Sequence, residues 1–194
     1  DIRLTEDLEQ AHIIYAFPGI AAGDPDFHVA QLHAMVLGGG MSSRLFQEIR
    51  EKRGLCYSIS SHASSFADGG VFDVYTGTGE QEMKELIPAL VSELRGSRVL
   101  PQAAEVRRAK AQMRAGLLMS LESTNARMDA LGANLLIFGR DITPEEVSAK
   151  VEAVTAEDIA RVATRILSGK PTLAALGPLA KLDPLAAIAA KLAA

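Results

Sequence analysis

The sequence predicts an α+β domain in which a mainly antiparallel mixed β-sheet carries helices packed on one face. Strand-like runs gather between Gln10 and Thr78, whereas helical spacing of apolar residues dominates the later part of the chain. Tyr57–Phe66 and Val71–Thr78 flank Ala67–Gly70, a loop whose aspartate and glycines suit a β-hairpin. The 194 residues, 48% of them hydrophobic, are enough to bury the core of one domain.

One strand and two helices are predicted before the hairpin. Gln10–Phe17 reads as a strand with largely apolar side chains on both faces, and Pro18-Gly19 ends it. Asp24-Pro25 predicts a helix start, because aspartate is a good cap and proline fits the first helical position. This helix runs to the triple glycine Gly38–Gly40, after which Ser42 or Ser43 can cap a second, short and charged helix.

A sharp corner is predicted where the short helix ends, at Arg53. Arg50 lies near the C-terminus of that helix, Tyr57 opens the next strand, and Gly54 makes the turn between them. Arginine and tyrosine are both strong hydrogen-bond donors. The spacing therefore predicts that two such donors converge on one spot.

Three helices with apolar side chains at spacings of three and four residues follow the hairpin. The first covers Met83–Leu94 and is expected to bury one stripe against the sheet. Val106–Leu121 repeats the pattern, and Met128–Phe138 continues it after a polar break. Gly139 is placed to end the third helix.

The last part of the chain predicts two more capped helices and a closing strand. The capping boxes are Thr143–Glu146 and Thr155–Asp158, and the closing strand is Thr172–Leu176. We expect residues 1–178 to form a single domain and the alanine-rich residues 179–194 to form a terminal helix or tail.

Charge and composition exclude several function classes. The net charge of −4 argues against a nucleic-acid partner, since basic residues cluster only locally and acidic residues interrupt that cluster. The longest apolar tract, residues 179–194, is too broken by charge and proline to span a membrane. Cys56 is the only cysteine, so no internal disulfide forms, which suits a reducing compartment. Because the chain begins at Asp1 without a leader, we expect an excised piece or a processed product.

The run from Gly38 to Ser58 resembles the second domain of short bacterial members of the pitrilysin/insulinase family, the zinc peptidases that include mitochondrial processing peptidase. Arg50, with Tyr57 seven residues on, matches the family's arginine and tyrosine pair. Further matching pieces in the same order extend the resemblance over nearly the whole chain: Leu8–His12, Leu121–Thr124, Leu135–Gly139 and Thr172–Pro178. The resemblance implies the processing-peptidase-like fold, also grouped as LuxS/MPP-like metallohydrolases.

The family's zinc motif, H-x-x-E-H on a helix, is absent from this sequence. The four histidines are His12, His28, His33 and His62, and each is expected to be a partly buried or surface residue. His28 and His33 lie five residues apart on one predicted helix, which turns their rings roughly 140° from each other. They cannot share a metal. The resemblance implies that zinc is bound by a domain absent from this chain, either an N-terminal domain or a partner subunit.

The resemblance also implies roles for the arginine and tyrosine pair. In this family the two side chains reach across a closed chamber toward the zinc of another domain. Tyr57 would lie near the scissile carbonyl, and Arg50 would hold a neighbouring carbonyl of the substrate. Gly38–Gly40, with Ser42 and Ser43, could form a flexible loop that faces substrate. The glycines could equally be a helix stop with close backbone packing.

We therefore expect the substrate-binding, site-completing half of a zinc metalloendopeptidase that hydrolyses extended or presequence-like peptides. A peptide could add as a strand at the serine-rich hairpin. The fragment alone is expected to be inactive, the longer protein to form a homo-oligomer such as a dimer, and the location to be the bacterial cytoplasm. The alternative is a non-catalytic scaffold or binding subunit, as the core subunits of the respiratory bc1 complex are in this superfamily. The presence of both Arg50 and Tyr57 favours the enzyme.

Overall fold

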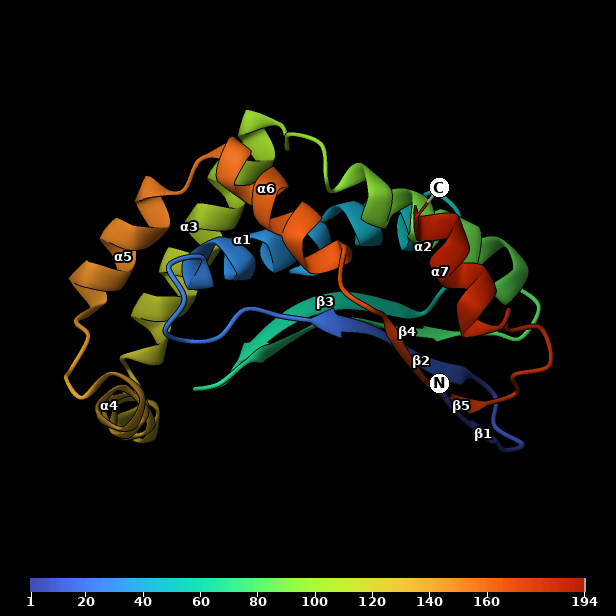
Figure 1. The fold of residues 1–194 in the computed structure, drawn as a ribbon, viewed down its shortest axis with the longest axis horizontal. Coiled ribbons are helices and arrows are strands. Elements are labelled where there is room, and N and C mark those ends of the chain that lie inside the picture. The colour runs from blue at the N-terminus through green and yellow to red at the C-terminus, as the bar shows by residue number, and fades with distance from the viewer. Residues whose placement is uncertain (194) are drawn as a thin grey trace.

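The computed structural model describes residues 1–193, which form a five-stranded sheet and a layer of helices over one of its faces (Figure 1). The strands are β1 (Ile2–Thr5), β2 (Ala11–Pro18), β3 (Ser58–Ser65), β4 (Gly70–Thr78) and β5 (Thr172–Gly177). The helices are α1 (Phe27–Gly38), the π-helix η1 (Phe46–Glu51), α2 (Met83–Gly96), α3 (Ala103–Ser120), α4 (Thr124–Phe138), α5 (Pro144–Ala153), α6 (Ala156–Leu167) and α7 (Leu185–Ala193).

The strand order across the sheet is β1-β5-β2-β4-β3. β1 runs parallel to β5, and every other neighbouring pair is antiparallel. The predicted α+β class with a mainly antiparallel mixed sheet is thus confirmed. The sequence patterns did not predict β1, because this strand is short and its partner β5 lies at the other end of the chain.

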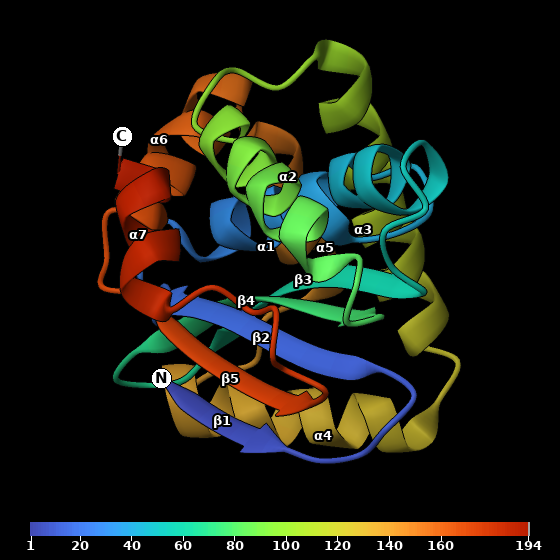
Figure 2. The same ribbon diagram turned by 90° about the vertical axis from the view of Figure 1, so that its right-hand side faces the viewer.

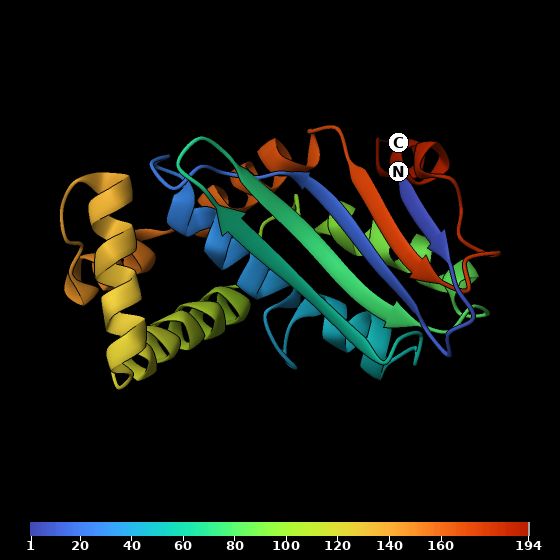
Figure 3. The ribbon, with the colours of Figure 1, turned by 90° about the horizontal axis from the view of Figure 1, so that it is seen from below.

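The core lies between the sheet and the helices. Side chains of β2 alternate between the two faces of the sheet, as successive residues of a strand must: Ile13, Tyr15 and Phe17 are buried under the helices. His12 and Ile14 point to the opposite face, which no helix of residues 1–193 covers (Figure 3). The view along the long axis shows α1, α2, α6 and α7 stacked above the sheet (Figure 2).

The expected apolar stripe is buried on α2 but not on α4. All six predicted stripe positions of α2 are buried: Met83, Leu86, Ile87, Leu90, Val91 and Leu94. The predicted continuation on α4 is wrong as a core prediction, because no residue of that helix is buried. α4 lies beyond the end of the sheet (Figures 1 and 3). Its Met128, Leu131 and Leu135 are 65%, 45% and 52% exposed within the described residues.

Helix starts agree with the predicted caps at two places and differ at two. Thr143 and Thr155 accept hydrogen bonds from the main chain of their own helices, as predicted. α1 begins at Phe27, two residues after the predicted proline, and in the turn before it the Asp24 carboxylate accepts a hydrogen bond from the Asp26 N–H (2.8 Å).

Neither Ser42 nor Ser43 caps η1, which begins at Phe46 and ends at Glu51, before the predicted Arg53. Ser43 is buried, and its hydroxyl has no hydrogen-bond partner within residues 1–193.

The C-terminal helix α7 packs into the core. Its Ile188 and Leu192 are buried and belong to the main hydrophobic cluster. Ala194, the last residue of the predicted tail, lies outside the described residues. The division of the chain after residue 178 stays a prediction. Within residues 1–193 no helix is long and apolar enough to cross a bilayer.

Candidate functional site

The corner between η1 and β3 is built by main-chain hydrogen bonds. Lys52 N–H donates to Gln47 O (3.0 Å), a five-residue step typical of π-helices, which occur frequently at functional sites. Gly54 then turns the chain with φ +65°, a left-handed conformation that glycine adopts without strain. The predicted turn residue is thus the residue that makes the turn.

Arg50 and Tyr57 are brought together at this corner. The Nε of Arg50 donates to the main-chain oxygen of Tyr57 at 2.7 Å, and Nη1 donates to Glu51 Oε1 at 3.0 Å. The guanidinium lies over the ring of Phe46, with its carbon 4.5 Å from the ring centroid, within cation–π range. Within residues 1–193 these bonds use Nε and Nη1, which leaves Nη2 available for another acceptor.

The main chain of Tyr57 is fixed while its side chain projects into solvent. Its N–H donates to Gly77 O (2.9 Å) on β4, and its carbonyl accepts the bond from Arg50. The Tyr57 residue is nevertheless 72% exposed, an unusual fraction for a tyrosine that opens a strand. Among residues 1–193 its hydroxyl has no hydrogen-bond partner. Because the main chain of Tyr57 is held in place and its hydroxyl makes no hydrogen bond within residues 1–193, this side chain is suited to contact another molecule.

The three predicted glycines differ in what surrounds them. A Cβ on Gly38 would lie 2.4 Å from Ser61 N, and one on Gly39 would lie 2.6 Å from Met35 Cα, so close backbone packing requires glycine at both. A Cβ on Gly40 would meet nothing closer than 3.5 Å. Helix-stop packing therefore accounts for the first two glycines but not for Gly40.

The predicted substrate-facing residues divide between two hollows. Gly38, Gly39 and Gly40 line a hollow of about 650 Å³ that also contains Phe46, the ring beneath Arg50. Ser42 and Ser43 instead line a charged hollow of about 420 Å³ on the side of α2 and α3. There Arg44 makes a bidentate ion pair with Glu105 (2.7 and 2.8 Å), which lowers the pKa of that carboxyl.

A polar cluster that sequence reasoning missed lies on the uncovered face of the sheet. His12 Nδ1 is 2.9 Å from the hydroxyl of Tyr75, and the rings stack with centroids 6.1 Å apart. Both side chains lie near Gly77, the residue that receives the Tyr57 N–H. Strand alternation alone could have placed His12 on this face, but only the register shows that Tyr75 is its neighbour.

The residues present do not fit a zinc ion. Within residues 1–193 no group of three or more histidine, cysteine, aspartate or glutamate side chains lies close enough to hold a metal. His33 is buried against Phe72, with ring centroids 5.0 Å apart, and burial lowers its pKa to about 4. His12 and His62 lie on strands at the sheet's uncovered face, whereas His28 is on α1.

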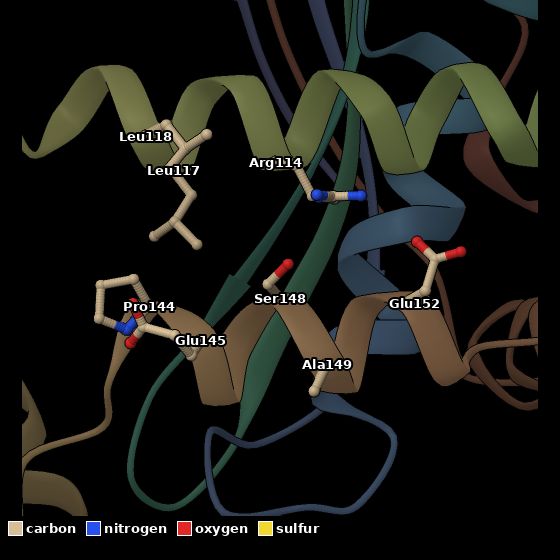
Figure 4. A pocket seen from close by; sticks show the side chains of 8 residues that line it. All are labelled: Arg114, Leu117, Leu118, Pro144, Glu145, Ser148, Ala149 and Glu152. Atoms are coloured by element: carbon tan, nitrogen blue, oxygen red, sulfur yellow. The ribbon is translucent and has the colours of Figure 1, made fainter.

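Another hollow, of about 440 Å³, opens between α3 and α5, away from the Arg50–Tyr57 corner. Figure 4 shows Arg114 of α3 opposite Ser148 and Glu152 of α5, with Leu117 nearby. Its lining holds no histidine, cysteine or tyrosine, and its two carboxylates, Glu145 and Glu152, lie seven residues apart along α5 instead of side by side. We therefore take the Arg50–Tyr57 corner, and not this hollow, as the candidate site.

Relatives of known sequence share most of this chain. An uncharacterized zinc protease of Rickettsia bellii is 37% identical over 176 residues, which are 90% of this chain and 43% of the relative. An uncharacterized zinc protease of Streptomyces coelicolor is 38% identical over 174 residues, 88% of this chain and 38% of the relative. The chain thus spans about two fifths of the length of the curated relatives it matches.

Solved structures share the fold. A chain of Complex III2 from Candida albicans, Inz-5 bound, has a TM-score of 0.90 at 20% sequence identity, over 98% of this chain and 48% of that chain. A conserved protein from Enterococcus faecalis V583 has a TM-score of 0.82 at 25% identity, over 94% of this chain and 42% of that chain. The first likeness shows the fold alone.

The model of one protein family matches residues 1–113, more than half of the chain, and is described as the peptidase M16 inactive domain. This match and the zinc-protease relatives confirm the predicted membership among pitrilysin-like peptidases. The chain belongs to the peptidase M16 family, as the domain that the family model describes as inactive.

Proposed function

We propose that this chain is the substrate-binding, site-completing half of a zinc metalloendopeptidase that hydrolyses extended peptides. Relatives named as zinc proteases support the reaction class, and the match to an inactive domain supports a complementing part. The observation that carries the proposal is the exposed phenol of Tyr57 on a main chain fixed by Arg50 and Gly77.

Each of the two side chains has its own role in this proposal. The Tyr57 hydroxyl donates a hydrogen bond to the oxygen that becomes negative when the scissile carbonyl is attacked. Arg50 Nη2 donates to a neighbouring substrate carbonyl, while Nε keeps the tyrosine in place through its main chain. Gly40, and more weakly Gly38, Gly39, Ser42 and Ser43, are proposed substrate contacts.

The zinc in the relatives' names would be held outside this chain, by an N-terminal domain or a partner subunit. We propose that the longer protein is a homo-oligomer in the bacterial cytoplasm and that this chain alone cleaves no peptide.

A non-catalytic scaffold is the second candidate, and one observation favours it. Arg50 donates hydrogen bonds to the Tyr57 carbonyl and to Glu51, and these bonds are consistent with an arginine that only stabilises the corner. A purely structural role of Arg50 does not account for the exposure of the Tyr57 side chain.

The first experiment compares Tyr57→Phe with Tyr75→Phe in the longer protein that carries the zinc-binding part. Tyr57→Phe should lower kcat about 10²–10³-fold, because one donor to the developing oxyanion is lost. Zinc content and the unfolding temperature should stay unchanged. Tyr75→Phe removes a tyrosine hydroxyl that is already engaged by His12, and should leave kcat nearly unaltered.

Arg50→Ala should raise KM as well as lower kcat, because the guanidinium is assigned to the bound substrate as well as to the transition state. The scaffold hypothesis is favoured if Tyr57→Phe keeps full activity on a peptide and Arg50→Ala lowers only thermal stability.

A further inference from the structure

The stretch from the end of α3 through α4 carries many exposed hydrophobic side chains. Of the eighteen large hydrophobic side chains exposed within residues 1–193, seven lie in this stretch and form what we call the α4 surface: Leu118, Met119, Met128, Leu131, Leu135, Leu136 and Ile137. Leu136 is 89% exposed. Soluble domains rarely expose so many neighbouring apolar side chains unless another molecule covers them.

The sequence nevertheless specifies both ends of α4. Ser123 Oγ accepts a hydrogen bond from Ala126 N–H (3.3 Å), and Gly139, with φ +69°, donates its N–H to Leu135 O (3.0 Å). The helix has 15 residues, none of them buried. Isolated helices of about 12–15 residues are marginal in water, because most helical stability in proteins comes from packing of an apolar face. A helix with defined ends and no buried residue is therefore expected to pack against a part outside residues 1–193.

α4 lies apart from the helices that cover the sheet and from the candidate site. Figure 2 shows it at the level of the sheet, below the layer of α1, α2, α6 and α7, and Figure 3 shows it beyond the end of the sheet. A hollow of about 430 Å³ opens beside it, with Leu121, Met128 and Leu131 in its lining. No residue of α4 lines the hollow of about 650 Å³ beside the Arg50–Tyr57 corner. A body seated on α4 can thus be held without covering that corner.

The lengths of the relatives favour one occupant for this surface. The chain spans 43% and 38% of the two zinc-protease relatives, so more than half of each relative lies outside the matched part. A part joined to this chain by a linker has an effective concentration in the millimolar range, well above that of a separate copy. The joined part is therefore favoured over a second copy. The few charges nearby, Glu122, Arg127 and Asp129, have mixed signs and favour no highly charged partner.

We infer that the α4 surface is the docking site of the zinc-bearing part of the same, longer chain. The inference rests on the proposed function and adds to it the place where the complementing part is held. Apolar contacts on α4 hold the two parts together in this arrangement, while Arg50 and Tyr57 stay free to reach the zinc.

Exposed methionines test the inference without any substitution. Met119 and Met128 belong to the α4 surface and are 73% and 65% exposed, Met41 is 75% exposed elsewhere, and Met83 is buried. In the chain alone, hydrogen peroxide should oxidise the three exposed methionines at similar rates and Met83 far more slowly, which also verifies the fold. In the longer protein, mass spectrometry should show Met119 and Met128 oxidised about tenfold more slowly than in the chain alone. Unchanged rates at both would overturn the inference.

Dilution distinguishes the joined part from a second copy of the chain. Contacts within one chain do not depend on protein concentration, so the protection of Met119 and Met128 should persist when the longer protein is diluted about a hundredfold. Protection that is lost on dilution, or that appears in the chain alone at high concentration, would assign the surface to a second copy, and the inference would fall.

A matched pair of double variants tests the surface in the longer protein. Leu131→Asp with Leu135→Asp places charge on the docked face, and should restore fast oxidation of Met119 and lower peptide turnover about tenfold, with zinc content unchanged. Val99→Asp with Leu100→Asp adds the same charges between α2 and α3, at positions 66% and 53% exposed, and should change neither. In the chain alone both pairs should leave the unfolding temperature nearly unaltered, since none of these side chains is buried. Full protection and normal turnover with both α4 substitutions would overturn the inference.

A failure of the docking site and a failure of the proposed function give different results. Tyr57→Phe should lower turnover and leave Met119 and Met128 protected. If Tyr57→Phe keeps full turnover while both methionines stay protected, the catalytic role fails and the docking site stands. If both methionines are oxidised freely in the longer protein and Tyr57→Phe still lowers turnover, the docking site fails and the proposed function stands.

Discussion

The η1–β3 corner and helix α4 both present side chains to solvent, but only the corner holds them in place. At the corner, Tyr57 is 72% exposed while hydrogen bonds to Arg50 and Gly77 fix its main chain. On α4, Leu131 and Leu135 are 45% and 52% exposed, and no residue of the helix is buried. An exposed polar side chain on a main chain that is held in place is typical of a functional group, whereas an exposed apolar stripe is typical of an interaction surface.

The two regions also share one backbone feature, which makes them directly comparable. Gly54 at the corner has φ +65°, and Gly139 at the end of α4 has φ +69°. A Cβ at either position would meet nothing within 4 Å. The same substitution therefore causes the same local strain in both places, and any difference in outcome reports what surrounds them.

The largest expected difference is in stability. Phe72→Ala removes a fully buried ring of β4 and should lower the free energy of unfolding by about 3–5 kcal/mol. Leu135→Ala on α4 should change it by less than about 0.5 kcal/mol, because that side chain packs against little. Urea unfolding followed by circular dichroism measures both. A loss for Leu135→Ala that matches Phe72→Ala, or that depends on protein concentration, would show that α4 is covered in solution.

Lowering the pH should reduce the free energy of unfolding, because His33 is buried in its neutral form. Burial lowers the pKa of this histidine from 6.5 to about 4, so the unfolded chain binds the proton more tightly than the folded one. Stability should therefore fall as pH drops from 6.5 to 4, by up to about 3 kcal/mol, and the destabilisation is fully present below pH 4. His33→Leu should remove this slope. His62→Leu, at an exposed position, should keep it, and a slope that survives His33→Leu would assign it to another group.

Local patterns predicted the turn at Gly54 correctly, because the parts of the corner are close in sequence. Arg50, Gly54 and Tyr57 lie within eight consecutive residues, and the Arg50–Tyr57 hydrogen bond joins two of them, although Tyr57 also bonds to Gly77 on β4. The stripe of α2 was predicted for the same reason. The pattern on α4 is the same kind of stripe, but periodicity predicts a helix and one apolar face without saying what covers that face.

Features that depend on distant pairing could not be predicted. β1 forms because Ile2–Thr5 meets β5 near the other end of the chain. The His12–Tyr75 contact depends on the register of β2 and β4. Similarly, three identical glycines could not be told apart until packing showed that Gly38 lies against Ser61 and that Gly40 has room. The roles of these residues stay predictions.

The smallest expected effect is the most direct comparison of the two regions. Gly54→Ala and Gly139→Ala should each strain the backbone by about 1 kcal/mol, since both residues are left-handed. At Gly139 the strain should appear as faster hydrogen exchange in the last turn of α4, with peptide turnover of the longer protein unchanged. At Gly54 it should shift the Arg50–Tyr57 contact and lower turnover more than stability. Gly116→Ala, in the interior of α3, should leave turnover unchanged and slightly stabilise the chain. If Gly54→Ala and Gly139→Ala both spare turnover, the corner does not position the tyrosine for catalysis, and its hydrogen bonds serve the fold alone.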